Sequence, residues 1–505
     1  MKQKTLMWML LATAAVAAGC SSDDDVTPNS SSQSWNGTVR YATYSSQLGD
    51  NQVQVAWNDS AQVVISDNLN GLVSAQIRCG AVTLLAEESV AEEVTYTLSG
   101  TSSRGSLYMD GSYKATFVLN GLTLSSTDSA TINIRNGKRI AMKLADGTAN
   151  TLADASGGSH KACMMVKGHT EFSGSGSLTL AGKTGHAFWG KEYVQLKAST
   201  GSIKVTQAVG DGFNVNQFFQ MNGGTLDISG VGDDGIQVSY KTDDNDNTIP
   251  LTEDEDNTGE VIIKGGTLSV AVTNSSAKGI KAEGNITISD GTISVSASRN
   301  EGIETKSAME VTGGYVYSNS SDDAINSAST MSISGGYIFA NSSGNDGMDA
   351  NGNMTISGGT VVAVGANGAE VGIDVIENGT LTISGGNIIA IGGLENTNNV
   401  SGTCYQASSY TKGAWYGFYD NSGSLVTAFK VPSNSSMGTP MAVYTSTGTP
   451  SLKSGVSGSG TSYWNGNGYS SCSGGSTVSL STYTSSGMGG GGGPGGGGPG
   501  GGPGH

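Results

Sequence analysis

The chain has 505 residues, of which 78 are glycine and 13% are charged, with a net charge of -17 and a pI of about 4.6. This acidic balance excludes nucleic acid and anionic membrane surfaces as partners and favours cations. The five cysteines lack metal-ligand spacing and there are only four histidines, so zinc and redox chemistry are not expected.

The first twenty residues predict export. An apolar stretch from Leu6 to Ala18, too short to span a bilayer, gives residues 1–19 the form of a signal peptide. Small residues before Cys20 resemble the bacterial lipobox, in which cleavage leaves a lipidated cysteine; an ordinary cleaved signal is the alternative. The acids at 23–25 resemble the export tag of Bacteroidetes lipoproteins, or form a plain linker. We therefore expect a surface-exposed outer membrane lipoprotein that meets the membrane only through its lipid anchor.

Composition divides the remaining chain. Residues 20–34 are acidic and Ser-rich, which predicts a tether. Residues 35–110 are β-prone without a clear repeat and fit a small β-domain or the cap that covers the open edge of a solenoid. Apolar alternation marks 111–400 as a solenoid, and 401–486 is expected to supply closing strands. Residues 487–505 are almost only Gly and Pro, so we expect disorder there.

A block of about 22 residues recurs seven times between Asp211 and Ile391. Each block carries a glycine pair or its near equivalent, with apolar and polar residues alternating on either side. The pairs are Gly223-Gly224, Gly265-Gly266, Asp290-Gly291, Gly313-Gly314, Gly335-Gly336, Gly358-Gly359 and Gly385-Gly386. Alternation of period two predicts three short strands per block, and stacking the blocks every ~4.8 Å buries a continuous interior.

The predicted fold is therefore all-β, a right-handed parallel β-helix with three strands and about 22–23 residues per coil. A β-sandwich with coincidental spacing is the alternative. Only the β-helix predicts aligned apolar columns on an inner wall. One such column is Ile286, Met309, Met331, Met354 and Leu381.

Acidic residues concentrate just before the glycine of the third strand in each block. The residues at this position are Asp211, Asp234, Glu301, Asp323 and Asp346, with further acids at Asp233, Asp322 and Asp349. Stacked carboxylates repel one another unless a hard cation neutralises them, and calcium takes about six to eight such oxygens. We predict separate calcium sites on one edge, with the column broken at Lys278 and Val371. Asp-Gly also makes a good turn without any metal.

Two adjacent blocks carry aromatic residues in the same register. Tyr315 and Tyr317 align with Tyr337 and Phe339, which predicts four rings on one outer face. Aromatic faces suit the apolar face of a sugar, although stacked rings also stabilise a solenoid by covering its neighbours. Further aromatic candidates, for which core packing is the default, are Trp189, Trp415, Tyr416 and Trp464.

One coil carries an acidic insertion, and four cysteines follow Cys20. Residues 241–259 add about 20 residues to one coil and contain seven acids, which predicts a mobile loop; calcium binding there is the alternative. An exported location permits disulfides among Cys79, Cys163, Cys404 and Cys472. Cys404 with Cys472 is a candidate pair, although sequence does not set connectivity.

Several segments together resemble one family. They are residues 117–124, 138–144, 147–152 and 174–178, followed by the Asp-Gly-Ile repeats. The resemblance, over roughly residues 90 to 450, is to a bacterial carbohydrate-binding β-helix family typified by a clostridial protein that binds cellulose and polygalacturonate. It implies a pectate-lyase-like fold, binding without catalysis, and calcium held by Asp211, Asp234 and Asp346. Glu301 and Asp323 match that motif in part, and Lys278 and Val371 depart from it.

Pectate lyases and polygalacturonases also use parallel β-helices, so catalysis is an alternative to binding. A lyase needs a base, and Arg299 is the only arginine between residues 200 and 400. A polygalacturonase needs paired carboxylates with a nearby histidine; Asp233-Asp234 resembles such a pair, but coil counting places neither His169 nor His186 beside it. We therefore expect a calcium-assisted, non-catalytic binder of acidic or cellulosic polysaccharide. The alternatives are a structural adhesin or spacer stiffened by calcium, and a calcium-dependent lyase.

Overall fold

The computed structural model describes residues 38–484 except 244 and 398. The predicted signal peptide, Cys20, the tether and the Gly/Pro tail lie outside the described residues. The described chain is all-β, with 55% of it in strands, and forms a β-solenoid of about 14 turns, which confirms the predicted parallel β-helix. Within the described ranges, a 3-10 turn, η1 (Asp67–Leu69), is the one helical element, and no helix has the length and hydropathy of a membrane span.

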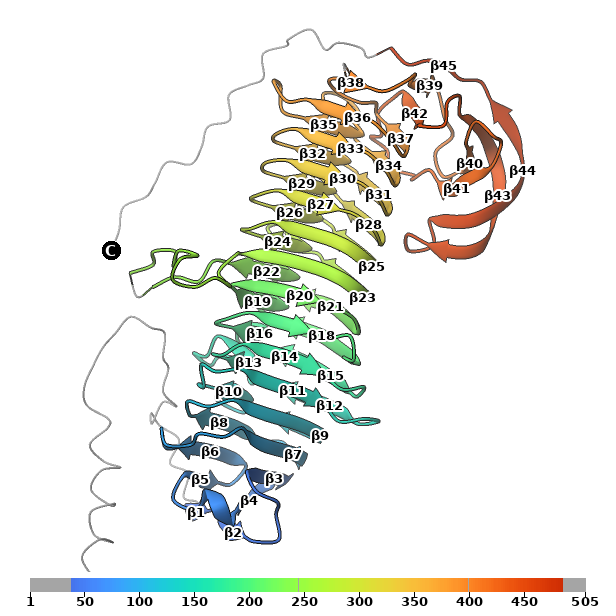
Figure 1. Cartoon of the computed structure of the whole chain (residues 1–505). Helices are drawn as coiled ribbons and strands as arrows, with labels where there is room; N and C mark the ends of the chain where they lie inside the picture. Colours follow the sequence, from blue (N-terminus) through green and yellow to red (C-terminus); the bar gives the residue numbers. More distant parts are fainter. Residues whose placement is uncertain (1–37, 244, 398, 485–505) are drawn as a thin grey trace, which may run out of the picture. The chain divides into compact units, whose positions relative to one another are not determined.

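The chain divides into two compact units, residues 1–287 and 288–505. In the first unit, strands of successive coils lie side by side in three parallel columns (Figure 1). One column consists of β8 (Ser106–Asp110), β10 (Ile132–Ile134), β13 (Ala162–Val166), β16 (His186–Gly190), β19 (Phe213–Asn216), β22 (Ile236–Ser239) and β24 (Ile280–Ala282). The second consists of β9 (Ala115–Ser125), β11 (Ile140–Leu144), β14 (Thr170–Ser173), β17 (Val194–Leu196), β20 (Phe218–Met221) and β23 (Glu260–Val272). The third joins the far halves of β9 and β23 through β12 (Ala149–Ala153), β15 (Ser177–Gly182), β18 (Ser202–Ala208) and β21 (Thr225–Val231).

The parallel pairing begins well before residue 111, where the sequence repeat becomes visible. Strand β3 (Gln52–Asn58) already pairs in parallel with β7 (Val94–Ser102), and β6 (Ala81–Ala86) pairs in parallel with β8. The remaining early strands are β1 (Arg40–Tyr41), β2 (Thr43–Ser45), β4 (Ser60–Ser66) and β5 (Val73–Arg78). Antiparallel pairs β3–β4, β5–β6 and β1–β5 lie among them. The first coils thus lack glycine pairs because antiparallel hairpins supply part of their turns.

The second unit repeats the three columns with shorter strands. They are β26 (Ile303–Thr305), β29 (Ile325–Ser327), β32 (Met348–Ala350) and β35 (Ile373–Val375); β27 (Met309–Val311), β30 (Met331–Ile333), β33 (Met354–Ile356), β36 (Leu381–Ile383) and β38 (Asn399–Val400); and β28 (Tyr315–Ser320), β31 (Tyr337–Ser342), β34 (Thr360–Val364) and β37 (Asn387–Ile391). Strand β25 (Ile286–Ala297) spans the boundary between the units and its second half pairs with β28. The predicted inner column is confirmed within this unit, since Met309, Met331, Met354 and Leu381 are paired in register and at most 2% exposed.

The end of the second unit departs from the solenoid pattern. Strand β42 (Met441–Thr445) adds antiparallel to β37, and β39 (Tyr405–Ala407) and β45 (Ser481–Thr482) continue this edge. Four further strands close into a small barrel, here termed the C-terminal barrel: β40 (Trp415–Tyr419), β41 (Leu425–Lys430), β43 (Ser451–Tyr463) and β44 (Gly468–Val478). A separate barrel was not foreseen from the sequence.

Glycine pairs recur because the second residue of each pair turns the chain where coils touch. Gly336 has φ 84° and Gly359 has φ 82°, in the left-handed region that L side chains avoid. A Cβ at Gly336 would lie 2.8 Å from the carbonyl oxygen of Gly313, one coil away. The pair therefore meets two demands at once, positive φ and close approach of backbones.

Candidate functional site

The acids predicted as metal ligands come together in the first unit. Asp211 lies two residues before β19, and Asp233 and Asp234 lie just before β22, its neighbour in the same column. Each of the three carboxylates offers an oxygen within 4.8 Å of the others, the only such group among the residues that the structure describes. We refer to Asp211, Asp233 and Asp234 as the acid triad.

Each buried aspartate in the column also bonds to the coil that follows. Asp211 Oδ1 accepts from the backbone N–H of Asp234 at 3.0 Å, and Asp234 Oδ1 accepts from the N–H of Lys278 at 2.7 Å. Lys278 still donates its N–H to Asp234, but it brings no carboxylate to accept from the coil that follows, so this run of the ladder ends at the predicted break. The turn role of these aspartates is thus present together with the carboxylate cluster.

The second unit contains the same ladder. Asp323 Oδ1 accepts from the N–H of Asp346 at 3.0 Å, and Asp346 Oδ1 accepts from the N–H of Val371 at 2.6 Å. Each bond spans one coil, as in the first unit. Val371, like Lys278, receives the last bond of its ladder and has no carboxylate to extend it.

Burial makes the acid triad costly to ionise fully. Burial raises the pKa of Asp234 to about 7, the nearby charge of Asp211 adds to the rise, and the N–H of Lys278 opposes it. The pKa of Asp233 is also raised, first by burial and then by Asp211. The Lys281 ammonium lies 3.9 Å from Asp234 Oδ2 and lowers the pKa of both carboxyls. A hard cation among three carboxylates would remove the same repulsion, so the donor set fits calcium.

A histidine that sequence reasoning placed elsewhere lies beside the triad. His186 Nδ1 is 3.2 Å from Asp211 Oδ2 and accepts the N–H of Asp211 at 3.0 Å. Asn214 donates to the same Asp211 Oδ2 at 2.7 Å. The coil-count expectation was wrong because β16 pairs with β19 so that Phe188 faces Phe213, which puts His186 level with Asp211. The sequence alone could have revealed this register, because Ala187-Phe188 aligns with Gly212-Phe213.

The acids predicted in the second unit are held by amides and backbone rather than gathered into a triad. Asn326 donates to Asp323 at 3.0 Å and to Asp349 at 2.9 Å, and Asn345 donates to Asp322 at 2.7 Å. Glu301 begins the coil of β26, and no group of three ligands forms around it among the described residues. Among the described residues, the acids of the second unit therefore do not bring three carboxylates as close together as the acid triad does.

Burial raises the pKa of several carboxyls in the second unit. The pKa rises to about 7 for Asp323, about 9 for Asp346 and about 6 for Asp349. Asp374, which sequence reasoning did not single out, has a pKa raised to about 8 by burial and by its contact with Glu395. Its place in the repeat, three residues after Val371, corresponds to that of Asp349 after Asp346 and could have revealed it.

The four aromatic residues predicted for sugar contact do stack, but they do so beneath the C-terminal barrel. The Tyr315 and Tyr337 rings are 5.1 Å apart, and Tyr463 of β43 lies 5.3 Å from Tyr315 and 5.5 Å from Tyr337. Phe339 is 1% exposed and packs edge-on against Trp464, while Tyr317 belongs to the same cluster. This packing fits the alternative of rings that stabilise the solenoid, and Phe339 is too buried to contact a sugar. Tyr315, Tyr317 and Tyr337 keep partial exposure, so sugar contact at these three rings stays a prediction.

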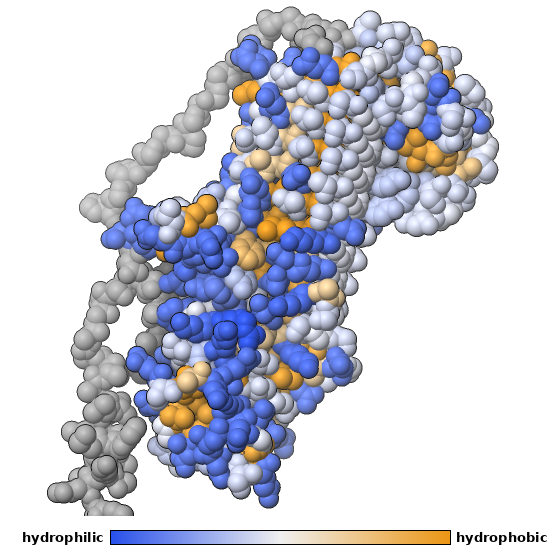
Figure 2. Space-filling view, viewed as in Figure 1, coloured by the Kyte–Doolittle hydropathy of each residue, from blue (hydrophilic) through white to orange (hydrophobic). Residues whose placement is uncertain are grey.

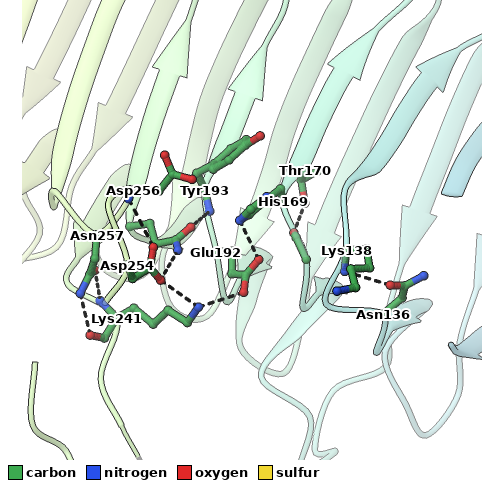
Figure 3. Close-up of polar contacts among 12 residues, drawn as sticks. Asn136, Lys138, His169, Thr170, Glu192, Tyr193, Lys241, Asp254, Asp256 and Asn257 are labelled. Atoms are coloured by element: carbon green, nitrogen blue, oxygen red, sulfur yellow. Dashed lines mark hydrogen bonds and ion pairs between the residues drawn. The ribbon is translucent and has the colours of Figure 1, made fainter. Parts of the chain in front are cut away.

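Polar contacts tie the acidic insertion to the preceding coil, and its mobility stays a prediction. Lys241 donates to Glu192 at 2.9 Å and to Asp254 at 3.1 Å, and all three side chains are less than one fifth exposed (Figure 3). Asn257 donates to two backbone carbonyls of the insertion and is 1% exposed. The single lysine offsets part of the negative charge that suggested a mobile loop.

The insertion lies beside a short stack of rings. His169, Tyr193 and Phe218 stack at 4.3 and 4.5 Å between centroids, and His169 Nε2 lies 3.0 Å from Glu192 Oε2 as an ion pair. The pKa of His169 is raised chiefly by this bond. Because Tyr193 is covered on both faces by its neighbours, the stack stabilises these coils.

The candidate disulfide is absent. Cys79, Cys163, Cys404 and Cys472 are all free thiols. Cys404 contacts the carbonyl of Val443, whereas Cys472 contacts the hydroxyl of Tyr419. Burial raises the pKa of Cys163 and of Cys404 to about 12, so neither is a reactive thiolate.

Comparison with known proteins identifies the family. The model of carbohydrate-binding domain-containing proteins matches residues 86–347, more than half of the chain. The chain belongs to this family. The matched residues include the acid triad, the insertion and the first coils of the second unit. A carbohydrate-binding domain-containing protein of Acetivibrio thermocellus is 27% identical over 142 residues, which are 26% of this chain and 46% of that relative.

A solved structure gives a weaker likeness. It is that of a polysaccharide lyase-like protein from C. thermocellum, studied as a gadolinium derivative, with 21% identity and a TM-score of 0.35. The match covers 66% of this chain and 96% of that one. The chain matches 46% of the length of the curated relative from Acetivibrio thermocellus.

Proposed function

We propose that this carbohydrate-binding family member is a non-catalytic surface lipoprotein, anchored through Cys20, that binds acidic polysaccharide with calcium held at the acid triad. The observation that carries the proposal is the approach of Asp211, Asp233 and Asp234 to within 4.8 Å in a chain of this family. Oxygen donors of this kind suit calcium, which also binds uronate carboxylates.

The residues around the triad have distinct parts in this proposal. Asn214 and the ladder bonds fix the Asp211 and Asp234 carboxylates, so little side-chain freedom is lost when a cation binds. Asp233 is less buried than Asp234 and faces outward enough to share a cation with a ligand. The Lys281 ammonium adds a second positive group for a uronate carboxylate.

Asp233→Asn tests the proposal. Calorimetric titration with calcium should show at least about tenfold weaker binding, because one charged ligand is replaced by a neutral one. Affinity electrophoresis in polygalacturonate, with and without chelator, should show a parallel loss of the calcium-dependent retardation. Asp227→Asn, which removes a half-buried acid of β21 that pairs with Lys204, is the matched control and should change neither. Retardation of the wild type that chelator leaves untouched would overturn the calcium bridge.

Two other functions give different results in the same assays. A spacer stiffened by calcium would show chelator-sensitive melting without retardation in any polysaccharide. Hydrolysis gains one supporting observation, because His186 and Lys281 flank the three carboxylates. Release of reducing ends from polygalacturonate would then be seen and lost in Asp233→Asn. A lyase would instead form unsaturated product that absorbs in the ultraviolet and would need exposed Arg299.

A further inference from the structure

Positive charge is concentrated in one part of this acidic chain. Residues 111–210 contain eleven lysines and arginines against five aspartates and glutamates, whereas the whole chain has a net charge of -17. This stretch belongs to the first unit, and Figure 2 shows hydrophilic residues gathered over the coils of that unit. A polyanion would meet electrostatic repulsion over most of the protein but attraction over these coils.

Three of these cations lie at the same register in successive coils. Arg135, Lys167 and Lys191 directly follow the last residues of β10, β13 and β16, which pair in parallel. Their backbone N–H groups continue the pairing, since Lys167 donates to Ile134 and Lys191 donates to Val166 in the coil before. The residue before each cation is buried, so by alternation the three side chains point outward, and all three are partly exposed. We refer to Arg135, Lys167 and Lys191 as the cation row.

The backbone that carries the cation row is closely packed. Asn136 is 0% exposed and donates to the carbonyl of Tyr113 at 2.6 Å. At Gly168 a Cβ would lie 1.9 Å from the carbonyl oxygen of Lys138, so the glycine lets two successive turns touch. Successive members of the row are therefore held about 4.8 Å apart at the backbone, and like charges one strand apart repel each other. A series of anions laid along the row would remove this repulsion.

A further lysine lies at the other end of the same strands. Met165 and Trp189 point outward at paired positions of β13 and β16. Trp189 packs against the small cluster that contains Met165, and the Lys161 ammonium lies 5.0 Å from the centre of its ring. Lys161 precedes β13 whereas Lys167 follows it, so cations border both ends of this outer face. The indole thus positions a cation at the edge of the face.

The glutamates of the same stretch pair with cations outside the row. Glu171 Oε2 lies 2.9 Å from Lys197 Nζ, and Glu192 Oε1 lies 2.9 Å from Lys241 Nζ. Both glutamates are therefore engaged within the protein, and these coils keep their excess of positive charge.

We propose that the cation row is a second, calcium-independent binding site for an acidic polysaccharide. The three side chains of the row donate to carboxylates along one polysaccharide chain, and Lys161 donates to a carboxylate at the opposite end of the face. The site rests on the proposed function for its class of ligand, but it uses neither the acid triad nor a metal. Strand β19, which follows Asp211, pairs with β16, so a chain laid over these coils reaches the acid triad in the next one.

The test uses the full-length protein in excess chelator, which removes calcium-dependent binding. Affinity electrophoresis in polygalacturonate should still retard the wild type, though less than with calcium, and added salt should weaken this retardation. Each variant is compared with its own mobility in a gel without polysaccharide. Lys167→Glu should weaken binding about tenfold, Lys167→Gln should weaken it less, and Lys167→Arg should retain it.

Two features of the design protect the test. Lys167→Gln removes the charge without adding an acid, so the test stands even if Lys167→Glu disturbs the coil. Lys204→Glu makes the same charge reversal within residues 111–210, but on β18 in the third column, and should leave binding unchanged.

The outcomes separate the cation row from the acid triad. If chelator abolishes all retardation of the wild type, the inference is overturned while the calcium bridge stands. It is also overturned if both charge-removing Lys167 variants bind as the wild type does, or if Lys204→Glu weakens binding equally. If the Lys167 variants lose binding and Asp233→Asn does not, the cation row stands and the calcium bridge fails. Retardation in dextran sulfate but not in polygalacturonate would overturn the assignment of a carboxylated ligand.

Discussion

Replacing Asp346 by asparagine should stabilise the second unit, and increasingly so as the pH rises. The Asp346 residue is 6% exposed, and its Oδ1 accepts from the Val371 N–H at 2.6 Å. Burial raises its pKa from 3.8 to about 9, and the charges of Asp374 and Asp323 add to the rise. Asparagine keeps the acceptor for Val371 and has no charge to bury.

The sign follows from proton binding. Between about pH 4 and pH 9 the folded chain keeps a proton on Asp346 that the unfolded chain has released, so stability falls as the pH rises through this window. The pH of 7 lies about three units above the ordinary pKa of 3.8. The burial of Asp346 can therefore lower the free energy of unfolding at pH 7 by at most about 4 kcal/mol. Asp323 and Asp374 have raised pKa values and share this proton uptake, so we expect a gain of about 1–2 kcal/mol.

The assay is thermal unfolding in chelator from pH 4 to pH 8. The variant and the wild type should melt together near pH 4, and the variant should melt about 2–8 °C higher at pH 8, at about 2–4 °C for each kcal/mol. Asp290→Asn removes an exposed acid of the same unit and should follow the wild type. Parallel melting curves for Asp346→Asn and the wild type across the whole pH range would refute the reasoning.

Two further predictions concern the glycine turns and the insertion. Gly336→Ala forces a Cβ against the backbone of the preceding coil at positive φ and should destabilise by at least about 2 kcal/mol in chemical unfolding, whereas Gly71→Ala, with a similar φ but open space, should cost only about 1 kcal/mol. Lys241→Met leaves Glu192 facing a second acid and should cost about 1–3 kcal/mol, seen as faster proteolysis within residues 241–259. Lys204→Met, which breaks an exposed pair, should leave that cleavage rate unchanged.

The fold could be predicted from sequence where local demands repeat. Alternation such as that of Met331 and Ile333 states which side chains face inward, and the second glycine of each pair marks a backbone contact that no other residue fits. The first coils were hidden because their hairpins, such as β3 with β4, replace glycine pairs by antiparallel turns. Their parallel partners lie about 40 residues away and leave no short repeat.

The site was predicted in part, for a similar reason. The acid triad follows from the register of the repeat, but His186 lies in a weaker coil whose register only the pairing of β16 with β19 makes plain. The cover over Tyr337 could not be read from sequence at all. It depends on Trp464, 127 residues later, whose indole N–H donates to the Tyr337 carbonyl at 2.9 Å. Contacts at that separation follow from the tertiary fold and leave no local pattern.

The aspartate ladder has a consequence for how such a protein changes over generations. Its acceptor is one carboxylate, but its donor is a main-chain N–H, which every residue except proline can supply. A coil can therefore exchange its own acid for lysine or valine, as at positions 278 and 371, without disturbing the bond from the coil before. Each such exchange keeps the bond from the coil before and gives up only the bond to the coil after, and proline, which would lose both, is the substitution that those positions should exclude.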